Sequence, residues 1–419
     1  TTVATNALLE RRGATTALVT TPGFGDVIEI GRQDRPSLYD SFDDRPPPLV
    51  PRRLRLDTAC DDLAAHLVGV EAVAIALLYG YERSAEEAAI AAAIRTARPD
   101  LSISLSSEVV PEFREYERTV TTALNAYLMP EAGRYLGSLV TRAGESGLPV
   151  DVLVMRSSGG LMPIGEAAIL PASILLSGPA GGVVAAAAVG EELGRNRLVS
   201  FDMGGTSTDV CRIEDGRPEV SYERPVAGYP CRMAAVAVHT VGAGGGSVGW
   251  VDAGGSLRVG PRSSGAVPGP ACYGLGGSDP AVTDANVVLG RIDPGGLLAG
   301  SLPIDASLAA EAVATIGSRL GMDVPTAALG VVEVVEEVMA GAIRTVSIEQ
   351  GADPREAVLV AFGGAGGLHA TALARRLGMA GVVIPPYSGV FSALGLLLSP
   401  PRIDAARSTR IAEGDDLDK

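Results

Sequence analysis

The sequence is poor in the residues that mark several large classes of protein. Of its 419 residues only four are cysteine, and none of them stands in a CxxC pair. This spacing argues against a disulfide framework or a zinc cluster and favours reduced thiols in a cytoplasmic protein. No apolar run reaches transmembrane length without glycine, proline or charge, so we expect no membrane span. The cysteines are Cys60, Cys211, Cys231 and Cys272.

Basic residues are also in short supply. The chain has 34 Lys and Arg against 49 Asp and Glu, a formal net charge of -15, and no basic stripe is visible. A protein that binds nucleic acid needs such a stripe to neutralise phosphates, so we expect no nucleic-acid partner and favour small-molecule chemistry. Hydrophobic residues make up 47% of the chain, enough for a substantial core in two or three domains.

The run FDMGGTSTDV at 201–210 is the most informative stretch. It reads as strand, tight turn, strand, and Gly204 with Gly205 gives the backbone freedom that lets N–H groups approach an anion. Thr206 and Ser207 add hydroxyl donors beside these glycines. A lone glycine pair is more often an ordinary hairpin turn, but this pair has company elsewhere in the chain.

Two acidic residues bracket that turn. Carboxylates beside a phosphate make sense only when a hard cation lies between them, because like charges repel. We therefore assign Asp202 to a magnesium ion or its water shell, and Asp209 to orienting water or the metal. The alternative is that both aspartates are simply solvated.

Two further glycine clusters follow. The segment 357–378 begins as a buried strand and breaks into glycines before a helix, which offers unpaired amides and a positive dipole end to a nucleotide. The cluster HTVGAGGGSVGW spans 239–250 and could contact phosphate or ribose. The candidate nucleotide-binding glycines are Gly242, Gly244, Gly245 and Gly246 of this cluster and Gly363, Gly364, Gly366 and Gly367 of the other.

The order of the motifs resembles the hydantoinase A and 5-oxoprolinase family. The strings that carry the resemblance are FDMGGTSTD, VHTVGAGGGS, VPGPACYG, VTDANVVLGR and VAFGGAGGLHA, and it extends over nearly the whole chain. It implies an α/β, actin-like ATPase (ribonuclease H-like) fold, with mixed sheets flanked by helices in lobes that bind ATP between them. In such a fold 202–209 is the second phosphate loop and 361–370 the adenosine loop.

The resemblance also implies an activity. We expect ATP-dependent hydrolysis of a cyclic amide, of the hydantoin or 5-oxoproline type, through a phosphorylated intermediate, with ATP and Mg²⁺ as cofactors. An oligomer with a B-type partner subunit is expected. Two alternatives remain open: an ATP-dependent ketone (acetone or acetophenone) carboxylase subunit, and a non-catalytic nucleotide-binding scaffold.

One departure from the family pattern concerns the start of the chain. Relatives begin with a DxGGTxTD strand-turn-strand that forms the first phosphate loop, whereas only one such string is present and Thr1 is not preceded by it. We expect an incomplete N-terminus, with the first phosphate-loop segment missing and ATP hydrolysis weak or absent. The predicted domains are 1–118, the rest of an N-terminal domain; 119–406, the ATPase domain; and 407–419, a polar tail.

The three histidines can be weighed singly. His66 sits in helix-like text and is expected to be structural or exposed, while His239 and His369 adjoin the glycine clusters. A second divalent ion, zinc or manganese, held by His239 and Asp284 is one hypothesis, because imidazole and carboxylate suit those metals. The competing interpretation is that each histidine is an ordinary structural residue.

The positions of glycine and proline, which interrupt helices and strands, predict the local structure. Strands are expected at 72–80 and 101–107 with a helix at 85–97 between them, which is typical of a parallel sheet. The proline-rich segment 43–53 is expected to be an exposed connection. Further predictions are long helices at 112–147 and 326–350, a helix at 177–194 and a hairpin within 247–260.

Overall fold

The structure is a computed structural model that describes residues 2–37, 39–40, 42–60, 62–148, 151–298 and 300–409. Most of the predicted polar tail, 410–419, lies outside these residues. Two compact units divide the chain: one holds 1–178, 220–235 and 399–419, and the other holds 179–219 and 236–398. The predicted division after residue 118 falls inside helix α6, Glu115–Glu145.

The first unit is built around a four-stranded sheet of order β2-β1-β3-β4, in which every pairing is parallel. All residues of β1 and β3 are buried, which is typical of parallel strands that are covered on both faces of a sheet. This confirms the predicted βαβ arrangement. The bounds are α1 Val3–Leu9, β1 Thr16–Thr20, α2 Val27–Ile30, β2 Arg55–Asp57, α3 Leu63–His66, β3 Ala72–Ala76, α4 Ser84–Ala97, β4 Ser102–Leu105 and α5 Ser106–Val109.

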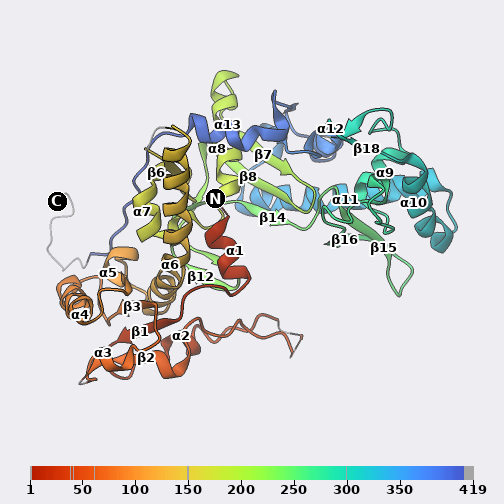
Figure 1. Cartoon of the computed structure of the whole chain (residues 1–419). Helices are drawn as coiled ribbons and strands as arrows, with labels where there is room; N and C mark the ends of the chain where they lie inside the picture. The colour runs from red at the N-terminus through yellow and green to blue at the C-terminus, as the bar shows by residue number, and fades with distance from the viewer. Residues whose placement is uncertain are drawn as a thin grey trace. The chain divides into compact units, whose positions relative to one another are not determined.

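Helix α6, Glu115–Glu145, packs against β3 and β4 (Figure 1), and its first half is buried. It matches the predicted helix at 112–147. The proline-rich connection differs from its prediction, since Val50 is fully buried in the core of this unit although neighbouring prolines reach the surface. The remaining elements are β5 Leu153–Met155, β6 Leu161–Pro163, α7 Ile164–Ile169, β10 Val220–Ser221, β11 Arg224–Val226, β12 Tyr229–Cys231 and β13 Ala235–Val236, which reaches the unit boundary.

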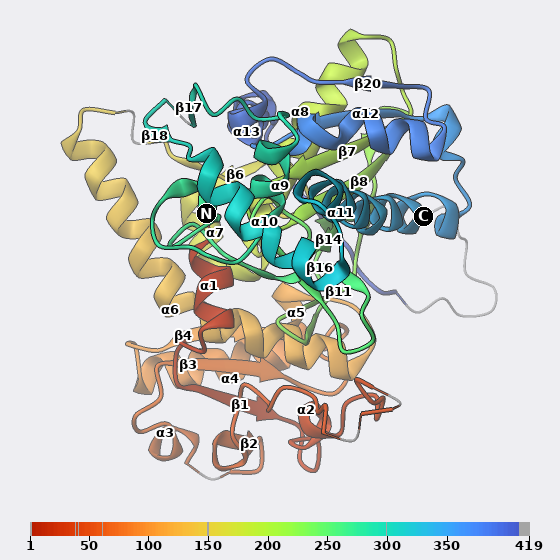
Figure 2. The same ribbon diagram turned by 90° about the vertical axis from the view of Figure 1, so that its right-hand side faces the viewer.

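The second unit contains a six-stranded mixed sheet of order β14-β8-β7-β19-β20, with β9 paired to β8. Strand β7 is antiparallel to β8 and parallel to β19. Helix α11, Val324–Val346, packs on β8 and β14 and against α12 (Figure 2). The bounds are α8 Ser177–Glu192, which begins at the boundary, β7 Leu198–Met203, β8 Thr208–Glu214, β9 Arg217–Pro218, β14 His239–Val241, β19 Val358–Phe362, α12 Gly366–Leu377, β20 Gly381–Val383 and α13 Phe391–Leu398.

The two faces of this sheet are covered differently. Val199, Phe201 and Met203 of β7 join the cluster built on α11, so Asp202 points to the opposite face. The other elements of this unit are the predicted hairpin, β15 Ser247–Val251 and β16 Leu257–Ser263; the predicted long helix, α11 Val324–Val346; and α9 Val282–Val288, β17 Leu297–Leu298, β18 Leu302–Pro303 and α10 Ala306–Leu320. No helix among the described residues is long and apolar enough to cross a membrane.

Candidate functional site

Two of the three glycine loops meet at one edge of the six-stranded sheet. Strand β19 runs parallel to β7 with Phe362 level with Asp202, so the loop after β19 begins beside the turn after β7. The amide of Ala365 donates to the carbonyl of Met203 at 3.0 Å. The carboxyl ends of parallel neighbours share an edge, which explains why loops 160 residues apart in sequence come together.

The contact between these loops requires glycine at position 363. Its backbone has φ of +82°, and a Cβ built there would lie 2.4 Å from Oδ1 of Asp202 and 2.5 Å from the carbonyl oxygen of Met203. No other residue type fits that space or that conformation without strain. The Asp202 carboxylate therefore lies directly against the backbone of the second loop.

The turn of residues 204–207 keeps most of its amides open. The Gly204 amide donates to the Ser207 carbonyl at 3.0 Å. Among the described residues, no acceptor takes the amides of Gly205, Thr206 or Ser207, and Gly205 and Thr206 are exposed. Unpaired amides at a glycine turn form a concave donor surface of the kind that binds phosphate.

Helix α12 offers a second set of donors. The amides of Gly364, Gly366 and Gly367 have no acceptor among the described residues, and the preceding Ala365 provides no side-chain cap. The first-turn amides of a helix carry its positive dipole end, so they attract anions. This site and the 204–207 turn lie side by side through the Ala365 to Met203 bond.

The third glycine loop, residues 242–246, holds the 204–207 turn in shape and does not itself line the candidate site. The amides of Gly245 and Gly246 donate to the carbonyls of Gly204 and Gly205 at 3.0 and 2.6 Å. Gly244 is buried, and its amide donates to the Ser247 hydroxyl at 2.8 Å. The predicted phosphate or ribose contacts of Gly244, Gly245 and Gly246 are therefore replaced by contacts that hold the turn in shape, whereas Gly242 is exposed.

The bracing loop contains one motif that the sequence reasoning missed. Residues 245–249 fit the G-x-S-x-G pattern of serine hydrolases. The Ser247 side chain is completely buried, however, and its hydroxyl donates to the Gly242 carbonyl at 3.3 Å while accepting the Gly244 amide. This hydroxyl is a structural link and is not placed to act as a nucleophile.

Asp202 and Asp209 face each other across β7 and β8, where they form a directly opposed pair. Burial raises the pKa of Asp202 to about 6, and the nearby Asp209 charge adds to this effect. Burial also raises the pKa of Asp209, while a hydrogen bond from the Thr240 hydroxyl, 2.5 Å from Oδ1, acts in the opposite direction. Two opposed carboxylates that resist ionisation make a favourable place for a cation.

Thr240 extends this row to a third strand. It pairs with Asp209 across β14 and β8, so its hydroxyl lies on the same face as both carboxylates. The sequence did not single it out, although His239 next to it was considered. The alternation of side chains along β14 could have identified it, because positions 239 and 240 must point to opposite faces.

The predicted second metal site of His239 and Asp284 is not assembled. The Asp284 side chain is fully buried and its carboxylate accepts the amides of Ala271, Cys272 and Ala281 at 3.2, 2.8 and 2.8 Å. No group of three or more His, Cys, Asp and Glu side chains that could hold a metal occurs in the part of the chain that the structure describes. Asp284 instead ties the loop at 271–272 to the start of α9.

His369 is buried behind the 363–367 loop, and each of its two ring nitrogens has a hydrogen-bond partner. Its Nδ1 lies 3.0 Å from Oε1 of Glu336, which also accepts from Arg291 at 3.2 Å. The Asn286 amide nitrogen donates to the Val282 carbonyl at 3.0 Å and faces Nε2 of His369 at 3.4 Å. Since that nitrogen can only donate, Nε2 accepts, and Nδ1 carries the proton given to Glu336.

This network has a structural role in the site. Although burial alone would raise it, the pKa of Glu336 is lowered by hydrogen bonds from His369 and Arg291. Buried Glu336 therefore pairs with the exposed Arg291 and also holds the ring of His369 on α12. His369 reaches no exposed surface, so it anchors the helix whose first amides form the site and does not itself touch a ligand.

Comparison with known proteins gives a consistent set of matches. The hydantoinase/oxoprolinase family model matches residues 118–405, and the model of the hydantoinase/oxoprolinase N-terminal region matches 1–62. Caprolactamase subunit alpha of Pseudomonas jessenii is 38% identical over 96% of this chain and 61% of its own length. 5-Oxoprolinase 1 of Arabidopsis thaliana is 34% identical over 97% of this chain and 36% of its own length.

Two solved structures of ATP-dependent enzymes are similar in fold to this chain. The crystal structure of the ATP-dependent caprolactamase from Pseudomonas jessenii has a TM-score of 0.84 and 36% identity, covering 95% of this chain and 61% of that one. The nucleotide-free structure of acetone carboxylase has a TM-score of 0.76 and 26% identity, covering 95% and 60%. These likenesses confirm the expected α/β, actin-like ATPase fold. The chain spans less than two thirds of the length of each of these relatives.

Proposed function

Because the chain belongs to the hydantoinase/oxoprolinase family, we propose that it is the A-type, nucleotide-handling part of an ATP-dependent hydrolase of cyclic amides. Hydantoins and 5-oxoproline are the substrate types, and a phosphorylated intermediate links ATP to ring opening. The observation that carries the proposal is the convergence of two sets of open amides on one sheet edge, beside a pair of carboxylates. Such an arrangement suits phosphoryl transfer, which depends chiefly on positioning and charge neutralisation.

Each of the three glycine loops has a separate role in this proposal. The amides of Gly205, Thr206 and Ser207 hold phosphate oxygens from one side, and those of Gly364, Gly366 and Gly367 hold the nucleotide from the other. ATP supplies the phosphoryl group that activates the carbonyl oxygen of a resistant ring amide. The bracing loop at 242–246 keeps the turn in its donor geometry.

Magnesium fits the donor set of Asp202 and Asp209. This ion is usually bound in nucleotide sites by one or two carboxylates, with phosphate oxygens and waters completing the octahedron, so two opposed aspartates suffice. The raised pKa of each aspartate reflects a cost of ionisation that a divalent cation would remove. We assign these two side chains to holding Mg²⁺ directly or through its waters.

The names of related proteins support an assembly. Caprolactamase subunit alpha and the acetophenone carboxylase gamma subunit are, by those names, parts of larger enzymes. We propose that this protein likewise works in a cytoplasmic oligomer with a B-type subunit that completes ring opening. Co-expression with a candidate B-type subunit, followed by size-exclusion chromatography, tests this part of the proposal.

Nucleotide binding is the first test. Isothermal titration of the chain with Mg²⁺ and a non-hydrolysable ATP analogue should give saturable binding, weakened at least about tenfold by Asp202→Asn because a charge-assisted contact is lost. Asp215→Asn removes a carboxylate from a turn at the other end of β8 and serves as the matched control. Equal affinity of all three proteins would refute the assignment of Asp202.

Substrate-dependent ATP hydrolysis separates the candidate reactions. Hydantoin, 5-oxoproline and caprolactam should stimulate release of ADP if the cyclic-amide reaction is correct. The likeness to acetone carboxylase favours a second candidate, in which acetone with bicarbonate stimulates and the amides do not. Binding of nucleotide with no turnover on any of these substrates, in the presence of the partner subunit and with a DxGGTxTD segment added ahead of Thr1, would favour a scaffold.

A further inference from the structure

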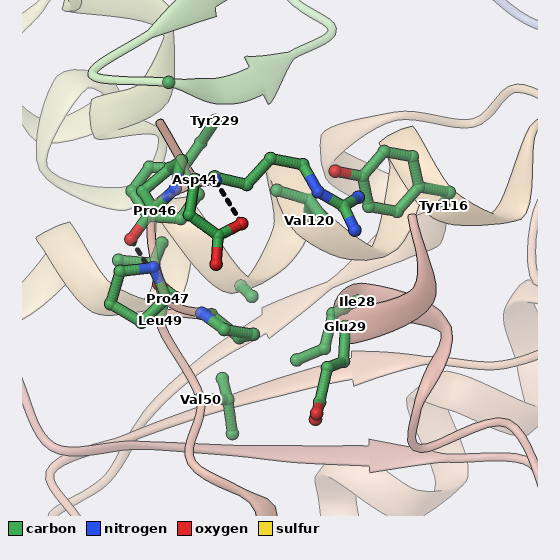
Figure 3. A pocket seen from close by; sticks show the side chains of 14 residues that line it. Ile28, Glu29, Asp44, Pro46, Pro47, Leu49, Val50, Tyr116, Val120 and Tyr229 are labelled. Atoms are coloured by element: carbon green, nitrogen blue, oxygen red, sulfur yellow. Dashed lines mark hydrogen bonds between the residues drawn. The ribbon is translucent and has the colours of Figure 1, made fainter. Parts of the chain in front are cut away.

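A cavity of about 400 Å³ lies wholly within the first compact unit and belongs to no part of the proposed nucleotide site. Its walls come from α2, from the proline-rich segment 44–50, from α6 and from the turn before β12 (Figure 3). This volume lies within the range of pockets that bind small molecules. The cavity is therefore large enough for a small ligand of its own.

One side of the cavity is apolar and held in place. Ile28, Leu49 and Val120 contribute aliphatic surface, and Pro46 packs on the turn at Gly228, where a Cβ would lie 2.8 Å from the proline ring. The Tyr229 hydroxyl donates to the Pro47 carbonyl at 2.6 Å. A proline segment fixed at both of these points forms a wall that is already shaped before any ligand arrives.

Two hydrogen-bond donors line the same cavity. The Arg45 guanidinium donates from NH1 to the Ile30 carbonyl at 3.2 Å but forms no ion pair with any described residue. The Tyr116 hydroxyl has no hydrogen-bond partner among the described residues, and Figure 3 places its ring beside the cavity. Burial raises the pKa of Tyr116, so this hydroxyl remains a donor at neutral pH.

The two donors are close enough to share one ligand group. The position that a Cβ of Gly31 would occupy is 2.5 Å from NH1 of Arg45 and 3.3 Å from the Tyr116 hydroxyl oxygen. The two polar atoms are therefore within about 6 Å of each other, a gap that one carboxylate can bridge with a hydrogen bond of ordinary length at each end.

The acidic residues at the cavity limit the charge of the ligand. Glu29 is neutralised by Arg52 and Arg55, and the hydrogen bonds from these arginines lower its pKa to about 2. Asp44 accepts the backbone amide of Arg45 at 2.7 Å and pairs with no cation among the described residues. A ligand with a second negative charge would be repelled by Asp44.

We propose that this cavity is a binding site for a small monocarboxylate with a compact apolar body, whose carboxylate bridges Arg45 and Tyr116 and whose body rests on the proline wall. The site is additional to the nucleotide site and does not depend on it. Its ligand is identified by three requirements: one negative charge, few polar groups besides it, and a size that fits the cavity.

The test uses cyclohexanecarboxylate as the probe and the whole chain as the protein. Isothermal titration should give saturable binding with one site, while the neutral cyclohexanecarboxamide and cyclohexane-1,4-dicarboxylate should each bind at least about tenfold more weakly, because they lack the charge or carry a second one. Equal binding of the acid and the amide would overturn the proposal, as would the absence of saturable binding by the acid.

Variants locate the site. Arg45→Gln should weaken binding of the probe at least about tenfold and Tyr116→Phe about three- to fivefold, since each removes one donor. Arg53→Gln, which changes an exposed arginine outside the cavity, should leave the affinity unchanged. Tyr116→Phe keeps the ring that packs on this unit, so its effect stays interpretable if Arg45→Gln fails to fold. Unchanged affinity in Tyr116→Phe and in folded Arg45→Gln would refute the assignment.

Discussion

The proposed nucleotide site of the second unit and the cavity of the first unit offer a ligand different kinds of surface. The former is made of backbone amides at Gly205 and Gly364 whose positions are set by strand register. The latter is made of side chains, with Arg45 and Tyr116 as donors. Backbone sites are sensitive to any added side chain, whereas side-chain sites are sensitive to the loss of one.

Gly244→Ala should have the largest effect on nucleotide affinity. Its Cβ would lie 2.6 Å from the Thr206 nitrogen and 2.7 Å from the Gly205 carbonyl carbon, both backbone atoms of the 204–207 turn. The turn must move, so affinity for Mg²⁺ with an ATP analogue should fall at least about a hundredfold by titration calorimetry, or about 2.7 kcal/mol.

Gly341→Ala is the matched control for that change. Position 341 lies inside α11, and a Cβ there meets nothing within 4 Å. Nucleotide affinity should be unchanged and the free energy of unfolding should rise by about 0.5–1 kcal/mol, because alanine favours a helix over glycine. Full nucleotide affinity in Gly244→Ala would mean that the turn does not bind phosphate.

His369→Ala tests whether buried side chains support the backbone site. It leaves Glu336 without one partner in a buried position, so the free energy of unfolding should fall by about 2–4 kcal/mol in urea. Amide exchange at the start of α12 should also accelerate. His66→Ala changes an exposed histidine and should alter stability by less than about 0.5 kcal/mol. Equal effects of the two changes would contradict the anchoring role.

Asp202→Asn should make stability less dependent on pH. The pKa of Asp202 rises from 3.8 to about 6 on folding, mainly through burial. Between these values the folded chain keeps a proton that the unfolded chain has released, so this group's contribution to stability is lost as the pH rises through that window. Without Mg²⁺, the variant should gain about 1–2 kcal/mol over the wild type at pH 7.

The measurement is urea unfolding of both proteins at pH 4 and pH 7. The wild type should lose more stability than the variant between these values, and added Mg²⁺ with nucleotide should reverse the difference at pH 7. Parallel pH profiles of the two proteins would show that Asp202 has no raised pKa.

Apart from the control variants, Thr240→Val should have the smallest effect. It removes the hydroxyl that donates to Asp209, a bond that acts to lower the pKa of that carboxyl, so the pKa should rise further. In the variant, Mg²⁺-dependent nucleotide affinity should then reach its maximum at a higher pH than in the wild type. The free energy of unfolding at pH 7 should change by less than about 1.5 kcal/mol. If the pH profile of nucleotide affinity is the same in the variant and the wild type, Asp209 does not take part in binding the metal.

The sequence indicated the two glycine turns of the second unit but not the cavity of the first. Glycine pairs after apolar strands identified 204–207 and 363–367, because such turns are encoded by adjacent residues. The cavity combines residues from Ile28 to Tyr229 that only the folded chain brings together. No local pattern could have linked Arg45 with Tyr116, and the exposed connection expected at 43–53 hid the burial of Val50.

The predicted metal pair shows a similar limit. The sequence placed His239 beside a glycine cluster and paired it with Asp284 because imidazole and carboxylate suit zinc or manganese, but residue type gives no information on which groups a carboxylate faces. Asp284 is consumed by three backbone amides. The bracing role of Gly245 and Gly246 was also hidden, since a buried glycine loop and an open one have the same composition.

The most direct measurement of the central claim is an NMR titration of the chain, selectively labelled with ¹⁵N-glycine and ¹⁵N-threonine, with Mg²⁺ and a non-hydrolysable ATP analogue. The amide resonances of Gly205, Thr206, Gly364 and Gly366 should shift together along one binding curve, because all four amides are expected to bind one nucleotide. Resonances at 205–206 that shift with a different affinity from those at 364–366, or that do not shift, would contradict the account.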